Sequence, residues 1–361
     1  MSENNKLPKY QHIADLLRSA IRTGKLGVGD RLPSFAQMYR DHGATATTMR
    51  RVYELLEKDN LIERRSGSGV YVAEPTNGLT GNVGVIGREV AGRGKTHFGL
   101  YLLNGIEKFT TKHNQHMLFL DSSGGLDEDG IKKVDGLLLL NDERQSHQLS
   151  NLPKHLPRVS LFRREDDVVN VITDEQSGGK QATSYLIEQG HRRIACLMEE
   201  LPDIPAQRLL GYKDALEDAR IAVVPEWMRL TPSLFAMENH SNYLEWGRQN
   251  MQEWLRQGWA DMGCTALLVQ NDEAAIGVMQ VLAEEGIKVP DRVSVMAFDG
   301  TDLCDHVSPR LCSMKLPFTE IGYKAAEILH QQIYLNKIEI QTVMLPMTLR
   351  PGESVAKILT E

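Results

Sequence analysis

The 361-residue chain has little of what marks secreted, membrane or metal-binding proteins. Its four cysteines form no CxxC pair and stand at no metal-like spacing with histidine, so we expect reduced thiols and neither disulfides nor a metal site. No apolar run approaches the length of a membrane span. The first residues, MSENNKLPKY, lack the apolar core of a signal peptide, so we expect a cytoplasmic protein without a membrane partner.

Motifs of catalysis and cofactor binding are missing as well. The sequence contains no P-loop, no nucleophile elbow, no HExxH and no context for a Schiff-base lysine. Gly87, Gly92 and Gly94 do not form a GxGxxG. We therefore expect no cofactor, and a binding protein rather than an enzyme.

The negative charge is concentrated in the larger part of the chain. Residues 1–75 carry 12 Lys and Arg against 9 Asp and Glu, whereas the remainder carries 29 against 39. The length predicts two or three domains. A basic head on an acidic body fits a protein that places only its head on a phosphate backbone.

Three short helices are predicted in the head. The first follows from an apolar stripe at helical spacing, formed by Ile13, Leu16, Leu17, Ala20 and Ile21. A second helix should start at Phe35, because Ser34 and Gln37 form a capping-box pattern, and Gly43 should end it. Thr45 should cap the third, whose stripe consists of Met49, Val52, Tyr53 and Leu56. Two helices joined by a tight turn are typical of a unit that places one helix in the DNA major groove.

A basic hairpin should follow the third helix. Two β-prone runs, at 61–62 and 70–72, flank the segment ERRSGSG, in which Gly67 and Gly69 allow close approach to a phosphate. The exposed face of the third helix presents Thr47, Arg50 and Arg51. Each arginine alone could equally be a solvated surface charge, but the ordered set is more specific.

Residues 9–73 resemble the winged helix-turn-helix of the GntR family of bacterial transcription factors. The resemblance rests on GDRLPS at 29–34, Thr-x-Thr-Thr-x-Arg at 45–50, YELLEKDNLIERR at 53–65 and GSGVYV at 67–72. It implies DNA contacts from Arg31, Ser34, Thr45, Thr47, Thr48, Arg50, Arg51, Arg65 and Gly67. Two arginines frequent in the family are absent, because Phe35-Ala36 replace Glu-Arg and Ala46 replaces an arginine. We expect docking to survive and the operator to diverge from the family consensus.

Beyond a linker at 74–81, the pattern changes to alternating strands and helices. Apolar runs typical of buried parallel strands occur at 83–86, 117–120, 134–140, 159–162, 194–198, 265–269 and 293–298, and a helix is predicted at 98–111. The segment between Leu120 and Val134 is short, so one helix should be truncated. Two such series predict an α/β fold of two lobes.

Polar residues follow several of these strands directly. Asn271-Asp272 follow TALLVQ, Asp299 follows VSVMAF, and Arg208 opens a predicted helix. Such groups could bind the hydroxyls of a polyol where the carboxyl ends of strands meet. Asp272 alone is better explained as a helix cap, whereas Asp299 and Arg208 together favour a ligand site.

The body resembles the LacI-type effector domain, which is related to periplasmic sugar-binding proteins. The matching segments are VDGLLLL at 134–140, ITDEQSGGKQATSYLIEQGHRRIACL at 172–197, QRLLGYKDAL at 207–216, QNDEAAIGVMQVLAEEGIKVPDRVSVMAFDG at 270–300 and SPRLCSMKLPFTEIG at 308–322. By this resemblance the effector contacts would be Phe98, Arg163, Arg164, Arg208, Asn271, Asp299 and Phe318. No hinge-helix sequence precedes the body, consistent with a GntR head in place of the usual LacI-type head.

The two resemblances imply a division into a DNA-binding domain at 1–73, a linker at 74–81 and an effector-binding and dimerisation domain at 82–361. The first lobe would comprise about 82–173 and 315–336, and the second about 174–314 and 337–361. The implied function is a homodimeric repressor of carbohydrate-utilisation genes that binds operator DNA and a sugar-like effector. A GntR head also occurs on pyridoxal-phosphate-dependent aminotransferase-like enzymes, an alternative that the missing lysine context disfavours. The identity of the sugar, its phosphorylation, and repression against activation stay open.

Overall fold

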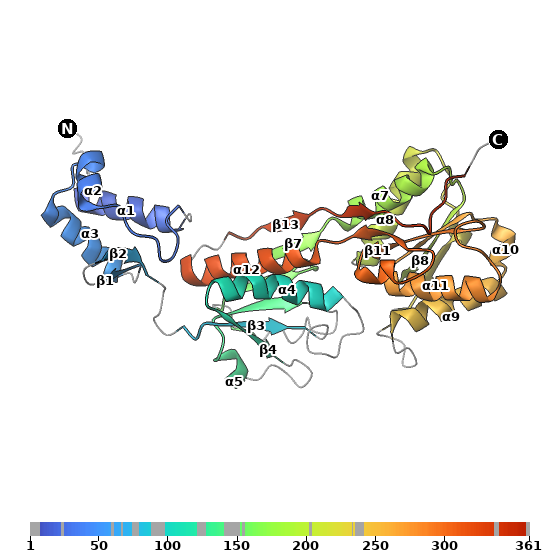
Figure 1. The fold of residues 1–361 in the computed structure, drawn as a ribbon, viewed down its shortest axis with the longest axis horizontal. Helices are drawn as coiled ribbons and strands as arrows, with labels where there is room; N and C mark the ends of the chain where they lie inside the picture. The colour runs from blue at the N-terminus through green and yellow to red at the C-terminus, as the bar shows by residue number, and fades with distance from the viewer. Residues whose placement is uncertain are drawn as a thin grey trace.

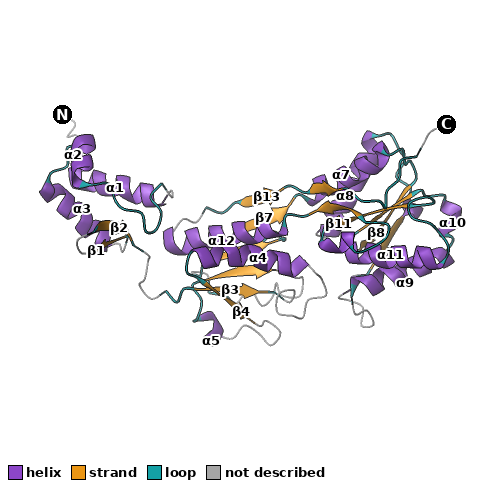
Figure 2. Ribbon diagram, viewed as in Figure 1, coloured by secondary structure: helices purple, strands orange, loops and turns teal. Residues whose placement is uncertain are grey.

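The computed structural model describes residues 8–22, 25–58, 61–65, 68–73, 79–87, 98–120, 128–140, 152–153, 156–201, 204–232, 234, 242–335 and 339–358. Figure 1 shows a small N-terminal head beside a first lobe, with a second lobe at the far end. Helices cover the sheets of both lobes (Figure 2).

The head is a winged helix-turn-helix. It comprises α1 (Lys9–Arg22), α2 (Phe35–His42), α3 (Ala46–Lys58) and the antiparallel hairpin of β1 (Ile62–Arg65) and β2 (Gly69–Val72). The predicted stripes form its core, except that Leu16 is 40% exposed and that Ala20 and Tyr53 are only half-buried. The Ser34 hydroxyl accepts a hydrogen bond from the Gln37 amide, which confirms the predicted start of α2. Gly43 ends α2 in the left-handed conformation, with φ of 59°.

The first lobe is a parallel sheet in the order β13-β7-β6-β5-β3-β4. Its strands are β3 (Asn82–Ile86), β4 (His116–Leu120), β5 (Gly136–Leu140), β6 (Arg158–Leu161), β7 (Val169–Thr173) and β13 (Thr342–Leu345). Helices α4 (Phe98–Lys112) and α12 (Phe318–Leu335) pack together on one face. The expected truncated helix is α5 (Glu128–Ile131), with four residues.

The second lobe repeats this arrangement, with the sheet order β14-β12-β11-β10-β8-β9. Its strands are β8 (Ile194–Glu199), β9 (Met228–Thr231), β10 (Ala266–Val269), β11 (Ser294–Asp299), β12 (Cys312–Lys315) and the antiparallel β14 (Thr348–Arg350). Its helices are α7 (Glu175–Glu188), α8 (Ile204–Asp218), α9 (Tyr243–Arg256), α10 (Trp259–Met262), α11 (Asp272–Glu284) and the short η1 (Pro225–Trp227) and η3 (Asp302–Asp305). Alternate strand residues pack against α7 and α8 on one face and against α9 and α11 on the other. All four cysteines are buried free thiols.

The chain crosses between the lobes after β7, after β12 and after β13. The third crossing corrects the expected division of the body. Residues 337–361 were assigned to the second lobe, but β13 pairs with β7 in the first. This strand alternates exposed and half-buried residues at the sheet edge, so its sequence has no buried apolar run.

Candidate functional site

On the head, the first turn of α3 is held by two of the predicted DNA contacts. The Thr45 hydroxyl accepts from the Thr48 amide at 3.2 Å and lies 2.8 Å from the Thr48 hydroxyl. Thr45 therefore caps α3, as predicted. Both hydroxyls are engaged within the protein, so their contact with DNA stays a prediction.

The exposed face of α3 carries Thr47, Arg50 and Arg51. The Arg51 guanidinium lies 5.6 Å from the centre of the Tyr10 ring on α1. Arg50 forms no ion pair or hydrogen bond with the described part of the chain. Of the arginines on α3, Arg50 has its charge least committed to the protein itself.

The remaining predicted DNA contacts lie on the wing and at the start of α2. The exposed Arg31 bridges to Tyr71 of β2, and its guanidinium packs against Gly69, where an added Cβ would lie 2.8 Å from Nε. Arg65 pairs with Glu63 at 2.6 Å and lies over the Tyr71 ring. Ser34 is exposed and caps α2. Gly67 lies outside the described residues.

In the body, Arg208 is a buried side chain of α8, only 5% exposed; it lies in the second turn of that helix and does not open it as predicted. Its Nε donates to Glu175 Oε2 at 2.7 Å, and its Nη1 donates to the Gln270 carbonyl. The guanidinium also lies 4.3 Å from the centre of the Phe298 ring. The charge of Arg208 and two of its hydrogen-bond donors are therefore already engaged by residues of the second lobe.

Asp299 ends β11 and directly follows Phe298, whose ring contacts Arg208. Its φ of 100° is rare for a residue other than glycine. Burial and the neighbouring Asp272 raise the pKa of the Asp299 carboxyl well above its usual range, while Arg208 opposes the shift. No hydrogen bond satisfies this carboxylate among the described residues. Within the described part of the chain, Asp299 is thus an acceptor without a partner at the carboxyl end of β11.

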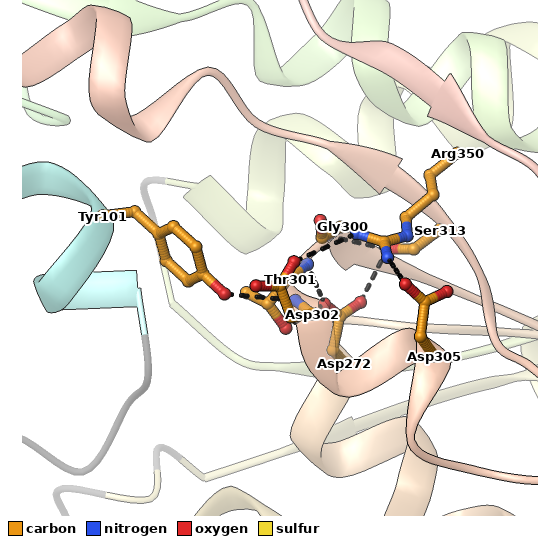
Figure 3. Close-up of polar contacts among 8 residues, drawn as sticks. All are labelled: Tyr101, Asp272, Gly300, Thr301, Asp302, Asp305, Ser313 and Arg350. Atoms are coloured by element: carbon orange, nitrogen blue, oxygen red, sulfur yellow. Dashed lines mark hydrogen bonds and ion pairs between the residues drawn. The ribbon is translucent and has the colours of Figure 1, made fainter.

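The helix cap predicted for Asp272 is wrong, because Asn271 occupies that position. The Asn271 side chain accepts from the Ala274 amide at 2.9 Å and starts α11. The buried Asp272 carboxylate instead accepts from the Thr301 amide, the Thr301 hydroxyl and the Ser313 hydroxyl, at 2.7, 2.8 and 2.6 Å (Figure 3). Asn271 therefore keeps its amide nitrogen available as a donor to an effector, and Asp272 fixes the loop that follows Asp299.

Three phenylalanines from separate elements form an aromatic trio at the lobe boundary. Phe98 begins α4 and Phe318 begins α12, and their rings stack with centres 5.0 Å apart. Phe162, which follows β6, meets both rings edge-on at 5.5 and 5.9 Å. Phe318 belongs to the same cluster of buried residues as the second-lobe side chains of α7, α8 and β8, and Phe98 and Phe162 pack against that cluster. The structure thus brings two predicted residues together and adds Phe162.

The other predicted arginines lie next to this trio in sequence. Arg163 is half-buried and its carbonyl accepts from the Ser160 hydroxyl, whereas Arg164 is exposed. Among the described residues, no group of three or more His, Cys, Asp or Glu side chains could hold a metal ion. Within the same ranges, no helix combines the length and apolar character needed to cross a bilayer.

Comparisons with known proteins agree with both halves of this architecture. Residues 9–72 match bacterial regulatory proteins of the gntR family, and residues 183–355 match a periplasmic binding protein-like domain. The ribose operon repressor of Haemophilus influenzae is 31% identical over 265 residues, which cover 70% of this chain and 76% of that repressor. The chain belongs to the GntR-headed LacI-type transcription regulators.

Two further relatives extend the comparison of this GntR-headed regulator. The arabinose metabolism transcriptional repressor of Geobacillus stearothermophilus is 25% identical over 352 residues, covering 92% of this chain and 93% of that repressor. A LacI family regulator from Enterococcus faecium, solved with bound ribose, superimposes with a TM-score of 0.63 at 25% identity, covering 77% of this chain and all of that one. Head and body therefore match one relative along almost their whole common length.

The regulator also has a lobe contact that the sequence did not reveal. Tyr101 of α4 lies next to Asp302 of η3, and Arg350 of β14 binds the Gly300 carbonyl and the Asp305 carboxylate (Figure 3). No local motif marks these residues, because their contacts join segments about 200 and 50 positions apart. Phe162 was missed for the same reason, although the aromatic residue directly before Arg163 was a usable signal.

Proposed function

We propose that this regulator represses carbohydrate-utilisation genes by binding operator DNA with its winged head, and that an uncharged sugar-like effector between its lobes changes that binding. One observation carries the proposal. Arg208, an Asp299 carboxylate that accepts no hydrogen bond from the described residues, and an aromatic trio converge at the lobe boundary of a chain whose head exposes Arg50.

A sugar needs two kinds of surface, and the proposed site offers both. Phe98, Phe162 and Phe318 supply an apolar surface for the face of a pyranose or furanose ring. Asp299 accepts and the Asn271 amide donates hydrogen bonds to hydroxyl groups. Relatives named as ribose and arabinose repressors, and a neighbour solved with ribose, support this ligand class.

The charge of the site favours an unphosphorylated sugar. Arg208 is paired with Glu175, so its positive charge is already balanced. Asp272, Asp299 and Glu273 add acidic groups around it. A phosphate would bring further negative charge into this partly buried region, where unbalanced charge is costly.

Regulation would follow from the spacing of two heads. A two-fold operator requires half-sites about 34 Å or a multiple apart, so we propose a homodimer. Exposed apolar residues on corresponding edge strands, Phe119 of β4 and Leu230 of β9, support a partner along that side. An effector that favours one lobe arrangement would shift operator affinity by its differential binding, about 1–3 kcal/mol in typical cases. Such control would act in the cytoplasm, where operator DNA lies.

The relatives are transcription regulators, and we propose that this chain likewise is not an enzyme. The alternative is a pyridoxal-phosphate-dependent aminotransferase-like body. The two are separated by the purified protein's absorbance near 400 nm and by turnover of amino donors. A pyridoxal-phosphate absorbance band together with transamination activity would contradict the proposal that the chain is not an enzyme.

A paired ligand screen tests the proposed effector site. We expect one or more monosaccharides to raise the melting temperature, their phosphate esters to have little effect, and Asp299→Ala to abolish the shift. The same sugar should alter binding to the DNA upstream of the protein's own gene. A sugar response that survives Asp299→Ala would contradict the site, and a screen without any hit would contradict the sugar class.

A further inference from the structure

We propose that Tyr101 is a positioning residue of the effector site, which joins the first lobe to the loop that carries Asp299 and so sets how readily the lobes close. The inference rests on the proposed function, because it concerns the same site. Tyr101 is not part of either sequence resemblance.

The contact itself crosses the lobe boundary. The Tyr101 hydroxyl, on α4 of the first lobe, accepts a hydrogen bond from the Asp302 amide of the second lobe at 3.2 Å (Figure 3). The tyrosine is half-buried, and its ring packs against the core of the second lobe. Its carbonyl accepts from the Thr319 hydroxyl at 3.2 Å, which ties it to the first turn of α12.

The loop that Tyr101 contacts is held firmly on its other sides. Asp272 binds the amide and hydroxyl of Thr301, and the Gly300 amide donates to the Ser313 hydroxyl at 3.1 Å. Arg350 Nη1 donates to the Gly300 carbonyl at 2.9 Å. The loop therefore moves with the second lobe as a unit, and the contact with Tyr101 forms only when that lobe stands close to the first.

The same loop begins with the proposed effector ligand. Asp299 lies three residues before Asp302, with its carbonyl bonded to the Leu316 amide at 3.1 Å. An effector that touches Asp299 and the aromatic trio must hold both lobes at one spacing. The Tyr101 hydrogen bond stabilises that spacing before the effector binds. Without the hydroxyl, a larger part of the binding free energy would be needed to close the lobes.

Tyr101→Phe tests the proposal, because it removes the hydroxyl and keeps the ring. Lobe spacing is measured in the full chain with spin labels at two exposed positions, Lys108→Cys on α4 and Glu285→Cys after α11. We expect Tyr101→Phe to shift the unliganded distance distribution towards longer separations. We expect the Kd for D-ribose or L-arabinose to rise about 3- to 10-fold, the usual weight of one hydrogen bond.

Tyr212→Phe is the matched control. Its hydroxyl donates to the Ile194 carbonyl at 2.7 Å inside the second lobe, so its loss should lower the melting temperature without changing lobe spacing or Kd. An unchanged distance distribution in Tyr101→Phe overturns the positioning role. If neither sugar binds the parent protein, the choice of sugars under the proposed function fails, while the distance measurement still decides the role of Tyr101.

Discussion

Asp299 combines a strained backbone with a partly buried carboxyl that has no hydrogen-bond partner among the described residues. Each feature destabilises the folded chain, since a left-handed non-glycine residue and a desolvated carboxylate both cost free energy. A residue kept only for folding would be replaced by one that avoids both costs. The cost is consistent with a group kept to bind a ligand.

Asp299→Asn should therefore stabilise the unliganded protein, and more so at higher pH. Folding raises the pKa of this carboxyl. Protonation of the carboxyl therefore stabilises the folded state, and this contribution is fully present at pH values below the ordinary aspartate pKa of about 3.9. That contribution is lost as pH rises through the folded-state pKa. The melting temperature of the variant should exceed that of the parent at pH 8, and the difference should shrink towards pH 5.

The exposed Asp291 provides the control for this series. Asp291→Asn should leave the melting temperature almost unchanged at each pH. A lower melting temperature for Asp299→Asn at pH 8 would show that the carboxylate is stabilising, contrary to the expected sign.

At the same scale, sequence patterns located residues better than they assigned their roles. Asn271 and Asp272 were both found at the end of a predicted strand, but the helix cap was assigned to Asp272, whereas Asn271 caps α11. Either residue type can cap a helix, and only the tertiary position of Thr301 and Ser313 shows what Asp272 binds. Phe162 and Tyr101 depend on distant segments, which no local pattern records.

Among the elements, α3 is where DNA affinity should be most sensitive. Arg50→Ala should weaken operator binding by about 1–3 kcal/mol if it contacts a base, and effector binding should not change. Fluorescence anisotropy on the upstream DNA measures the first, and the sugar-induced thermal shift measures the second. Arg256→Ala removes one positive charge from α9 in the second lobe and should leave operator affinity near that of the parent. Equal affinity in all three proteins would exclude Arg50 from the interface.

The pair α4 and α12 should loosen in acid. The centre of the His330 ring on α12 lies 4.7 Å from that of His113, which directly follows α4, and burial together with His113 lowers the pKa of His330 to about 4. An unfolded histidine binds its proton near pH 6.5, so stability should fall as pH drops from 6.5 towards 4. His330→Asn, which keeps a donor for Gln115, should flatten this loss in thermal melts at pH 4.5–7. A parallel decline in both proteins would assign the acid sensitivity elsewhere.

Most strands with buried apolar runs were predicted, as was the edge strand β4, but the interior strands β7 and β12 and the edge strands β9, β13 and β14 were missed. The interior strands β3, β5, β8, β10 and β11 have nearly continuous buried runs. The edge strands β9, β13 and β14 expose part of their residues, so their sequences resemble loops. Which lobe such a strand joins depends on its partner, as the pairing of β13 with β7 shows.

Across the whole molecule, α12 reaches from the effector site to the head. Phe318 at its start belongs to the aromatic trio, and Leu335 at its end packs against the core of the head, where α12 contacts α1 (Figure 1). A shift of the lobes thus has a second route to the DNA-binding domain besides the linker. That route is a rigid element with both ends in packed contacts.

Leu335→Ser should therefore weaken the communication between the two sites while sparing each of them. We expect operator affinity without sugar and sugar affinity without DNA to stay within about twofold of the parent, because neither site contains Leu335. The sugar-induced change in operator affinity should fall at least severalfold. Full retention of that change would show that the linker alone carries the signal. Leu349→Ser, at an exposed position of β14, is the control.

Because both ends of α12 are held in packed contacts, its length is constrained. Its 18 residues span about 27 Å, and each added or deleted residue would turn one end against the other by about 100°. Surface loops tolerate insertions with little loss of stability. In this helix, the gain or loss of a single residue would change the orientation of the head relative to the effector site. Among regulators that share this docking, the residue count between Phe318 and Leu335 should be as invariant as any ligand-binding side chain.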